Sequence, residues 1–142
     1  MACSCSEKQL FHSDKAPKAI GPYTPAVKAG GLVFISGQLG IVPETGSIIE
    51  GGIETETRQA LVNLKTMLET AGASLEQVTK TTVFLRDINE FQKMNGIYGE
   101  FFHANPPARS AFQVGALPKG GAVEIEAIAV VGCDCEGCCK DQ

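Results

Sequence analysis

Residues 122–131 have the sequence AVEIEAIAVV and residues 105–114 have the sequence NPPARSAFQV, and these two stretches decide the fold. Both are apolar runs typical of β-strands, yet both carry charge. Side chains alternate along a strand, so Glu124 and Glu126 share one face of the later run, and Arg109 points out of the earlier one. A charge in an apolar strand is costly unless it is paired or exposed. The three charges therefore lie at an interface or in a functional site.

The composition predicts one globular domain. The chain has 142 residues, of which 44% are hydrophobic and 20% are charged, enough to bury a single core. No apolar run approaches the roughly 18 residues of a membrane span. Residues 1–8 lack the basic segment and apolar core of a leader peptide. We therefore expect a cytoplasmic protein with no membrane partner.

The charge balance narrows the class of ligand. The net charge is −4, and the 12 Lys and Arg residues are scattered along the chain. Nucleic-acid binding draws its affinity from phosphate neutralisation, so this balance counts against a DNA- or RNA-binding protein. It is compatible with a small anionic substrate held by one arginine.

All six cysteines lie at the chain ends, so they do not staple the core. We divide the chain into an N-terminal Cys-containing extension (1–7), a folded domain (8–132) and a Cys-rich tail (133–142). Two interpretations of the tail stay open: an oxidisable segment, or a soft-metal site. The cysteines are Cys3, Cys5, Cys133, Cys135, Cys138 and Cys139.

Hydrophobic periodicity predicts the order β-β-β-α-β-α-β-β. The first three strands are expected at 9–12, 26–29 and 32–39, the fourth at 78–85 and the last two in the opening stretches; helices are expected at 54–71 and 90–104, and a loop at 43–52. Ser36-Gly37 lies inside the third strand, where a glycine marks a bulge or a close approach to the backbone.

Two helices can cover only one face of such a sheet. The runs 32–39 and 122–131 nevertheless direct apolar side chains toward both faces. The uncovered face must therefore be closed by another copy of the chain. We expect Arg109 and Glu124 on or beside that interface.

Five short motifs occur in order and together resemble the reactive-intermediate deaminase family (RidA, also called YjgF). The resemblance spans roughly residues 8–132 and implies an α+β, chorismate-mutase-like single domain, with a mixed β-sheet and two helices packed on one face. It also implies a homotrimer with a central barrel and sites between adjacent subunits. The motifs are Gly21-Pro22-Tyr23, Ile35-Ser36-Gly37-Gln38, Val78–Val83, Pro107-Ala108-Arg109-Ser110, and Leu117-Pro118-Lys119 with Glu124–Ala129.

The resemblance also implies an activity, the hydrolysis of 2-iminobutanoate and 2-iminopropanoate to 2-keto acids and ammonia, with no cofactor. These reactive imines and their enamine tautomers come from pyridoxal-phosphate-dependent dehydratases. By the same resemblance Arg109 binds the substrate carboxylate and Glu124 positions water. The other residues that it assigns to substrate binding are Tyr23, Ser36, Gly37, Asn95, Ser110 and Ala111. Many bacterial members carry a cysteine where this chain has Ala111.

The residues alone leave alternatives open. Arg109 could form a structural ion pair with Glu126, and Glu126 could replace Glu124 as the water-positioning group. Tyr23 could pack over the sheet edge, and Asn95 could be a polar residue at the edge of the core.

Two other functions also stay open. One is a translation-inhibiting endoribonuclease, for which His12 and His103 are the only histidines in the sequence. The other is a non-catalytic regulator or chaperone that binds a small ligand in the same cleft.

Overall fold

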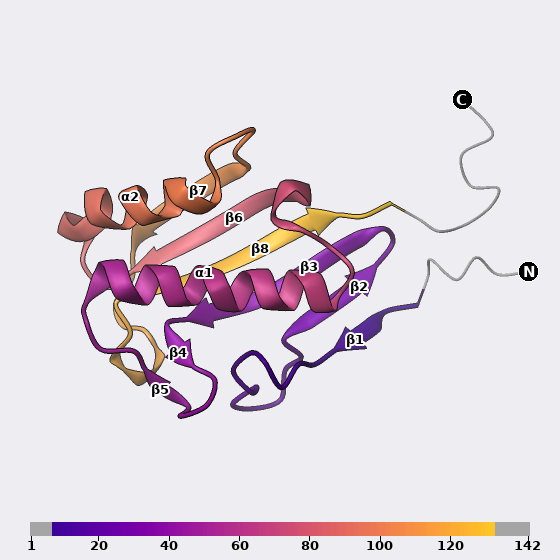
Figure 1. Cartoon of the computed structure of the whole chain (residues 1–142), viewed down its shortest axis with the longest axis horizontal. Helices are drawn as coiled ribbons and strands as arrows, with labels where there is room; N and C mark the ends of the chain where they lie inside the picture. The colour runs from indigo at the N-terminus through magenta and orange to yellow at the C-terminus, as the bar shows by residue number, and fades with distance from the viewer. Residues whose placement is uncertain (1–6, 133–142) are drawn as a thin grey trace, which may run out of the picture.

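The structure is a computed structural model and describes residues 7–132. The predicted strands and helices form an α+β domain (Figure 1). Three 3-10 turns, η2 (Leu75–Gln77), η3 (Ile88–Glu90) and η4 (Pro118–Gly120), join them. The strands are β1 (Gln9–Phe11), β2 (Ala26–Ala29), β3 (Leu32–Leu39), β4 (Ile41–Val42), β5 (Ser47–Ile48), β6 (Val78–Leu85), β7 (Ala108–Gln113) and β8 (Val123–Val130), and the helices are α1 (Ile53–Thr70) and α2 (Phe91–Phe101).

Six strands form one mixed sheet in the order β1-β2-β3-β8-β6-β7. β7 runs parallel to β6, and the other neighbours are antiparallel. The last strand of the chain therefore lies near the middle of the sheet, between β3 and β6. β1 and β7 form the two edges.

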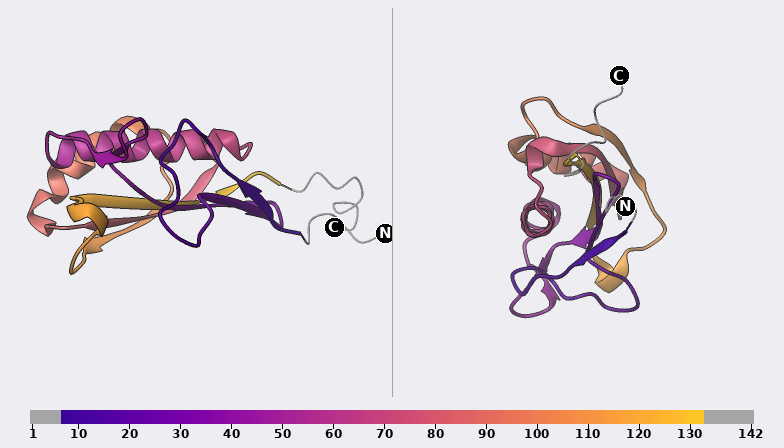
Figure 2. Two further views of the ribbon diagram at one scale, coloured as in Figure 1. Left: turned by 90° about the horizontal axis from the view of Figure 1, so that it is seen from below. Right: turned by 90° about the vertical axis from the view of Figure 1, so that its right-hand side faces the viewer.

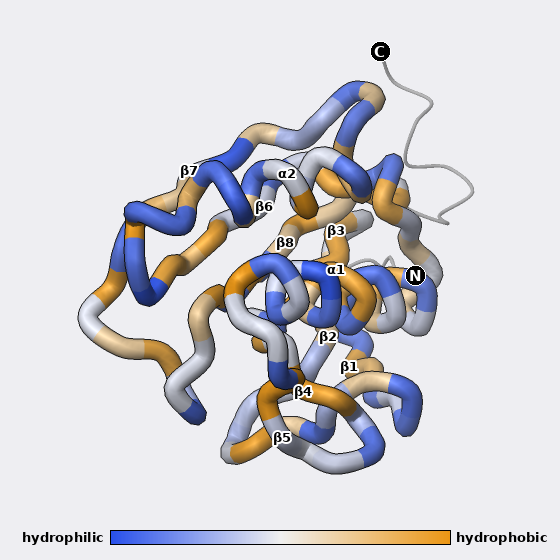
Figure 3. The backbone as a smooth tube through the Cα atoms, turned by 60° about the vertical axis from the view of Figure 1, so that its left-hand side comes forward, coloured by the Kyte–Doolittle hydropathy of each residue, from blue (hydrophilic) through white to orange (hydrophobic). Residues whose placement is uncertain are grey.

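Both helices pack on one face of the sheet, as the sequence predicted. Figure 1 shows them in front of the strands, and the turned views of Figure 2 show a helical layer on one side only. Hydrophobic and hydrophilic segments alternate along α1, because one side of the helix faces the sheet (Figure 3). The predicted apolar stripe of α1 is buried: Ala60, Leu61, Leu64, Met67, Leu68 and Ala71.

α1 ends in a glycine cap. Gly72 adopts a left-handed φ of 82° and donates its amide to the carbonyl of Glu69. Ala73 donates to the carbonyl of Leu68, which completes a Schellman motif. The cap fixes where the chain turns toward β6.

α2 is shorter than predicted. It ends at Phe101 and not near residue 104, because Phe102 leaves the helical conformation and Asn105 adopts a φ of 51° before the two prolines. The side chain of Asp87 accepts a hydrogen bond from the amide of Asn89 and so caps the short turn that leads into the helix.

The predicted loop at 43–52 contains structure that the sequence did not indicate. β4 and β5 pair as a two-stranded hairpin outside the main sheet. Two residues per strand are too few to leave a period in the sequence. Asn63 of α1 connects this region to the core, because its buried side-chain amide donates to the carbonyls of Leu39 and Ile41 at 3.0 and 2.9 Å.

The sheet face opposite the helices, which we call the open face, exposes large apolar side chains. Phe34 of β3 is 40% exposed and Phe112 of β7 is 46% exposed. The rings of Phe112 and Phe84 meet edge to face at 5.5 Å between centroids. The predicted uncovered apolar face is therefore present in the single chain.

Neither helix within residues 7–132 is long and apolar enough to cross a membrane. The N-terminal extension up to Ser6 and the tail from Cys133 lie outside the described residues. The soft-metal site that we considered for the six cysteines therefore stays a prediction, as does the proposed division into segments.

Candidate functional site

The bulge predicted at Ser36-Gly37 is confirmed and brings Glu124 against the backbone. The β3–β8 register shifts between Ile35 and Gln38. The Glu124 carboxyl group lies over Gly37, and a Cβ on residue 37 would be 2.9 Å from the Glu124 Cδ atom. Only glycine leaves room for the carboxylate here. Both explanations for this glycine, a bulge and a close approach, are correct.

Glu124 lines a cavity of about 620 Å³ on the open face. The predicted residues Tyr23, Ser36 and Gly37 line it too, and so does Glu126. The remaining lining residues come from the loop before β2, from the β3–β4 region and from η4: Pro17, Lys18, Ile20, Pro25, Gln38, Leu39, Ile41, Pro118 and Lys119.

Hydrogen bonds hold the wall of this cavity in place. The Ser36 hydroxyl donates to the carbonyl of Thr24 at 2.7 Å, and the Ser36 amide donates to the carbonyl of Pro25 at 3.0 Å. The Tyr23 hydroxyl accepts a hydrogen bond from the amide of Ile20 at 3.3 Å. Tyr23 is therefore anchored in its own loop, with its ring 48% exposed toward the cavity.

The surroundings of Glu124 in the cavity favour the protonated form of its carboxyl group. Burial raises the pKa of Glu124, and the nearby negative charge of Glu126 raises it further. Glu126 is exposed, whereas Glu124 is partly buried. The two glutamates on this face are therefore not equivalent, and Glu124 has the properties expected of a general base or acid.

Arg109 is held on the other side of the sheet. Its Nη1 atom donates to the Oδ1 atom of Asn95 at 2.7 Å. Its Cζ atom lies 4.7 Å from the ring centroid of Tyr98 and 5.5 Å from that of Phe91. Within residues 7–132 no carboxylate pairs with Arg109, whereas Arg58 forms an ion pair with Glu100. The guanidinium is thus positioned but has no anionic partner there.

Ser110 and Ala111 belong to the same edge strand but point differently. The Ser110 hydroxyl lies on the open face, where it accepts a hydrogen bond from the Lys80 ammonium at 2.8 Å. The Val114 amide donates to the carbonyl of Leu85 in β6. Successive amides of a strand point in opposite directions, so the Ala111 amide, three residues earlier, points away from β6. Arg109 and the Ala111 amide therefore both lie at the β7 edge of the sheet.

Arg109 and Glu124 do not meet within the single chain. Arg109 pairs in register with Thr81, which is fully buried under the helices, whereas Glu124 pairs with Phe84 on the open face. Arg109 and Glu124 therefore lie on opposite faces of the sheet and do not share a cleft. The same geometry excludes an Arg109–Glu126 ion pair within the chain, because Glu126 is also on the open face.

The predicted site residues thus form two groups. Tyr23, Ser36, Gly37 and Glu124 meet at the cavity. Asn95, Arg109 and the Ala111 amide meet at the β7 edge. Asn95 is a polar residue at the edge of the core, and its side-chain oxygen accepts the hydrogen bond from Arg109.

Sequence reasoning missed the aromatic rings beside Arg109. These rings belong to Phe91 and Tyr98 of α2. Their spacing from Asn95, four residues before and three after, is a signal that the three share one helical face. The cavity-lining residues before Tyr23 left no comparable signal, because their loop has no period.

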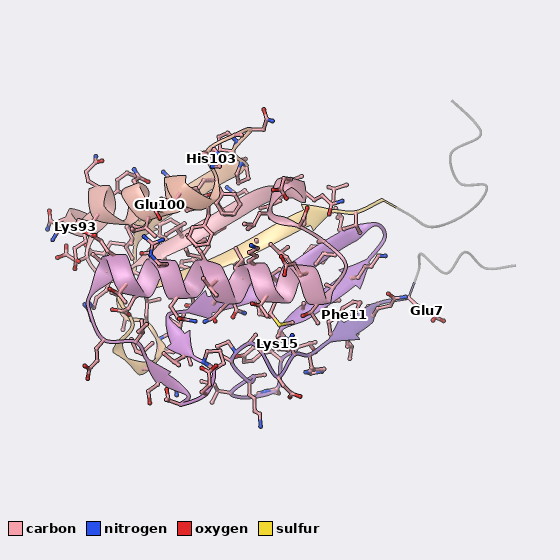
Figure 4. The ribbon with its side chains drawn as sticks, in the orientation of Figure 1. Glu7, Phe11, Lys15, Lys93, Glu100 and His103 are labelled. Carbon is pink, nitrogen blue, oxygen red and sulfur yellow. The ribbon has the colours of Figure 1, made fainter. Side chains whose placement is uncertain are left out.

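The two histidines do not form a pair in one chain. His12 follows β1 at one sheet edge, and His103 follows α2 beside the other edge (Figure 4). Both are exposed. Among residues 7–132 no three His, Cys, Asp or Glu side chains gather as metal ligands.

Comparison with known proteins gives one consistent result. The family model described as Endoribonuclease L-PSP matches residues 13–131. The chain is 49% identical over 125 residues to a 2-iminobutanoate/2-iminopropanoate deaminase of Bos taurus, which covers 88% of this chain and 91% of the relative.

Two solved structures extend this result. The crystal structure of RidA from the Antarctic bacterium Psychrobacter sp. PAMC 21119 superimposes with a TM-score of 0.84 at 46% identity, and covers 87% of this chain and 99% of that one. The crystal structure of E. coli TdcF with bound serine gives 0.82 at 42% identity, covering 86% and 98%. These matches span the whole folded domain. The chain therefore belongs to the RidA/YjgF family, the family of the endoribonuclease L-PSP model.

Proposed function

We propose that this protein is a hydrolase that acts on imines, a 2-iminobutanoate/2-iminopropanoate deaminase. The observation that carries the proposal is the state of Arg109, a guanidinium fixed by Asn95 and two aromatic rings with no carboxylate partner among residues 7–132. Such a cation is suited to bind a carboxylate through two parallel hydrogen bonds. A relative named for this activity is 49% identical.

The proposed substrate is a small 2-imino acid and the product a 2-keto acid. A TdcF structure that is 42% identical to this chain contains serine, an amino acid of the same size and with the same carboxylate. In the proposed site Arg109 and the Ala111 amide hold the carboxylate. Neither group is at the reacting carbon, so their task is to bind and orient the substrate.

Glu124 is the proposed water-positioning residue. Its carboxyl group lies in the cavity beside Tyr23 and Ser36, and burial raises its pKa. A raised pKa suits a group that takes a proton from water and returns it to the leaving nitrogen. Glu126, which is exposed, would tune Glu124 by its charge.

The reaction needs water and two proton transfers. Water adds to the carbon of the protonated imine, and Glu124 accepts the proton that the water loses. The proton then passes to the nitrogen of the tetrahedral intermediate. The C–N bond breaks while Glu124 transfers the second proton, from the hydroxyl group of the intermediate, to the leaving nitrogen, and the 2-keto acid and an ammonium ion leave. No cofactor enters the proposed sequence.

The proposed site is assembled from two protomers. Arg109 and Glu124 lie on opposite faces of one sheet, so one chain cannot bring both to one substrate. A second copy that covers the open face can bring its own β7 edge to the cavity. We propose the homotrimer with a central barrel that the family resemblance implies, and a cytoplasmic location.

Two other functions remain as outcomes of the test. An endoribonuclease is suggested by the description of the family model. A net charge of −4 disfavours phosphate binding, and the two histidines lie at opposite sheet edges, so they cannot act as an acid–base pair within one chain. A non-catalytic regulator would use Arg109 in the same way but would produce no keto acid.

The test couples the full-length protein to a threonine dehydratase and follows the decay of 2-iminobutanoate in the presence of semicarbazide, which traps free imine. We expect the wild type to accelerate formation of 2-oxobutanoate and Arg109→Ala to abolish the acceleration. Arg58→Ala is the matched control, since Arg58 pairs with Glu100 on the outer side of the helices. Wild-type protein without any acceleration, or RNA cleavage that survives Arg109→Ala, would refute the deaminase proposal.

A further inference from the structure

The guanidinium of Arg109 lies against aromatic rings that belong to one face of α2. Its Cζ atom is 4.7 Å from the Tyr98 ring centroid and 5.5 Å from the Phe91 ring centroid. Both distances fall within the roughly 6 Å range of a cation–π contact. Asn95, between the two rings in the helix, accepts the Nη1 hydrogen bond at 2.7 Å. We call Phe91 and Tyr98 the aromatic platform.

Tyr98 is itself fixed to the strands that carry the arginine. Its side chain is 5% exposed, and its hydroxyl forms a buried 2.7 Å hydrogen bond with the hydroxyl of Thr81. Thr81 lies directly beside Arg109 in the β6–β7 register. The ring of Phe102 packs on Tyr98 from the helix end, at 4.9 Å between centroids. The Tyr98 ring therefore has little freedom relative to Arg109.

We propose that Tyr98, assisted by Phe91, is a positioning residue for carboxylate binding by Arg109. The inference rests on the proposed function and deepens it. A free arginine side chain has many rotamers, and it loses that conformational freedom when it binds a ligand. The platform removes much of that freedom before the substrate arrives. Asn95 occupies one Nη1 hydrogen, which leaves the Nε–Nη2 side for the carboxylate.

The proposal makes an asymmetric prediction for kinetics. The carboxylate is not the reacting group, so a looser Arg109 weakens binding in the ground state and in the transition state alike. Loss of the Tyr98 ring therefore raises KM and leaves kcat almost unchanged. Loss of the Tyr98 hydroxyl alone, in Tyr98→Phe, keeps the ring under the guanidinium and has little effect on KM.

The experiment measures binding of 2-oxobutanoate by calorimetry and turnover of 2-iminobutanoate for three variants of the full-length protein. In Tyr98→Leu we expect binding weaker by about 3- to 30-fold, the range of a cation–π contact, with a parallel rise in KM. In Tyr98→Phe we expect binding within about 2-fold of the wild type. Phe11→Leu is the matched control, because Phe11 also packs against the core but lies in β1, at the sheet edge opposite Arg109.

The outcomes separate the two proposals. Equal binding by Tyr98→Leu and the wild type, or equal weakening by Tyr98→Leu and Phe11→Leu, would overturn the platform and leave the deaminase activity untouched. A wild type that binds 2-oxobutanoate without turnover would refute the activity alone, and one that does neither would refute both. If Tyr98→Leu fails to fold, Phe91→Leu replaces it, with a smaller expected effect because its ring is at 5.5 Å and not 4.7 Å.

Discussion

The carboxyl group of Glu124 lies against the backbone of Gly37, so that a Cβ on residue 37 would be 3.0 Å from the Glu124 Cγ atom and 2.9 Å from its Cδ atom. The bulge in β3 makes this approach possible, because it bends the strand beside Glu124 of the neighbouring strand β8. The glycine and the glutamate therefore act as one unit. A change in either must alter the position of the carboxylate in the cavity.

Gly37→Ala should displace the Glu124 carboxylate and lower kcat by about 10-fold or more, the range of a general acid–base contribution. The expected test is a double-variant cycle in which kcat is measured for Gly37→Ala, Glu124→Gln and the pair. Because both changes act on one carboxylate, Gly37→Ala should add little to Glu124→Gln. Fully multiplicative effects would contradict this coupling.

Activity should fall on the acid side at a pH above the ordinary 4.5 of a glutamate, because burial and Glu126 raise the pKa of Glu124. The carboxylate form is lost as pH falls through this raised pKa. Glu126→Gln removes the second cause, so the acid limb of kcat/KM should move to lower pH. The measurement is a pH profile of both proteins at low salt. An unmoved acid limb would exclude Glu124 as the titrating group, and Glu44→Gln, outside the cavity, serves as the control.

Asn95→Asp should impair the protein more than Asn95→Ala. The Asn95 oxygen accepts the Arg109 Nη1 hydrogen bond at 2.7 Å, so an aspartate there would place a carboxylate against the guanidinium. That ion pair would compete with the substrate carboxylate, and KM should rise by about 10-fold or more. Asn95→Ala loses only one hydrogen bond, for which we expect a rise of about 3- to 10-fold. Steady-state KM values decide the order, and the reverse order would contradict a carboxylate-binding Arg109.

Mixing two inactive variants should restore activity. We suppose that each site takes Arg109 from one protomer and Glu124 from another. When Arg109→Ala and Glu124→Gln assemble at random in equal amounts, about half of the sites have an intact Arg109 and about half of those also have an intact Glu124. About a quarter of the sites are then intact. The variants are unfolded together, refolded together and assayed for imine hydrolysis. Each variant refolded alone is the control. No recovery in mixed assemblies verified by mass spectrometry would show that the site does not cross an interface.

Asn63→Leu should destabilise the fold without touching the site. The Asn63 side chain is 1% exposed and donates to two backbone carbonyls, so its loss should lower the free energy of unfolding by about 1 to 3 kcal/mol. Val62→Ala, on the exposed side of the same helix, should change it by less than about 0.5 kcal/mol. Urea denaturation followed by circular dichroism measures both. Equal stabilities would mean that these carbonyls find other donors.

The sequence predicted those parts of the fold that depend on long periodic segments. The apolar stripe of α1 repeats over about three turns, and the run 78–85 is β-branched and mostly alternating, so both elements were located within one residue. β4 and β5 escaped because two residues per strand carry no period. The end of α2 was misplaced because the two prolines mark only the limit of the helix, whereas Phe102 leaves the helix earlier.

The candidate residues can be named from the sequence, but their arrangement within one chain cannot. Alternation along a strand groups Arg109 and Glu124 with the other residues on the same face of β7 and of β8. It does not say whether those two strand faces lie on the same side of the sheet. That relation is set by the β6–β7 and β6–β8 registers, which pair Thr81 with Arg109 and Phe84 with Glu124. Register depends on contacts between distant segments and has no local signal in the sequence.

The position of β8 has a consequence for how the chain folds. β1, β2 and β3 form one part of the sheet and β6 and β7 the other, and only β8 hydrogen-bonds to both. A ribosome delivers β8 last, so the two parts stay separate until almost the whole chain has been synthesised. Sheet closure and the arrival of Glu124 beside Gly37 are then one event, driven by pairings between residues up to about 100 positions apart in the chain. A nascent chain that stops before Val123 lacks the strand that joins the two parts of the sheet, and it lacks Glu124 in the cavity.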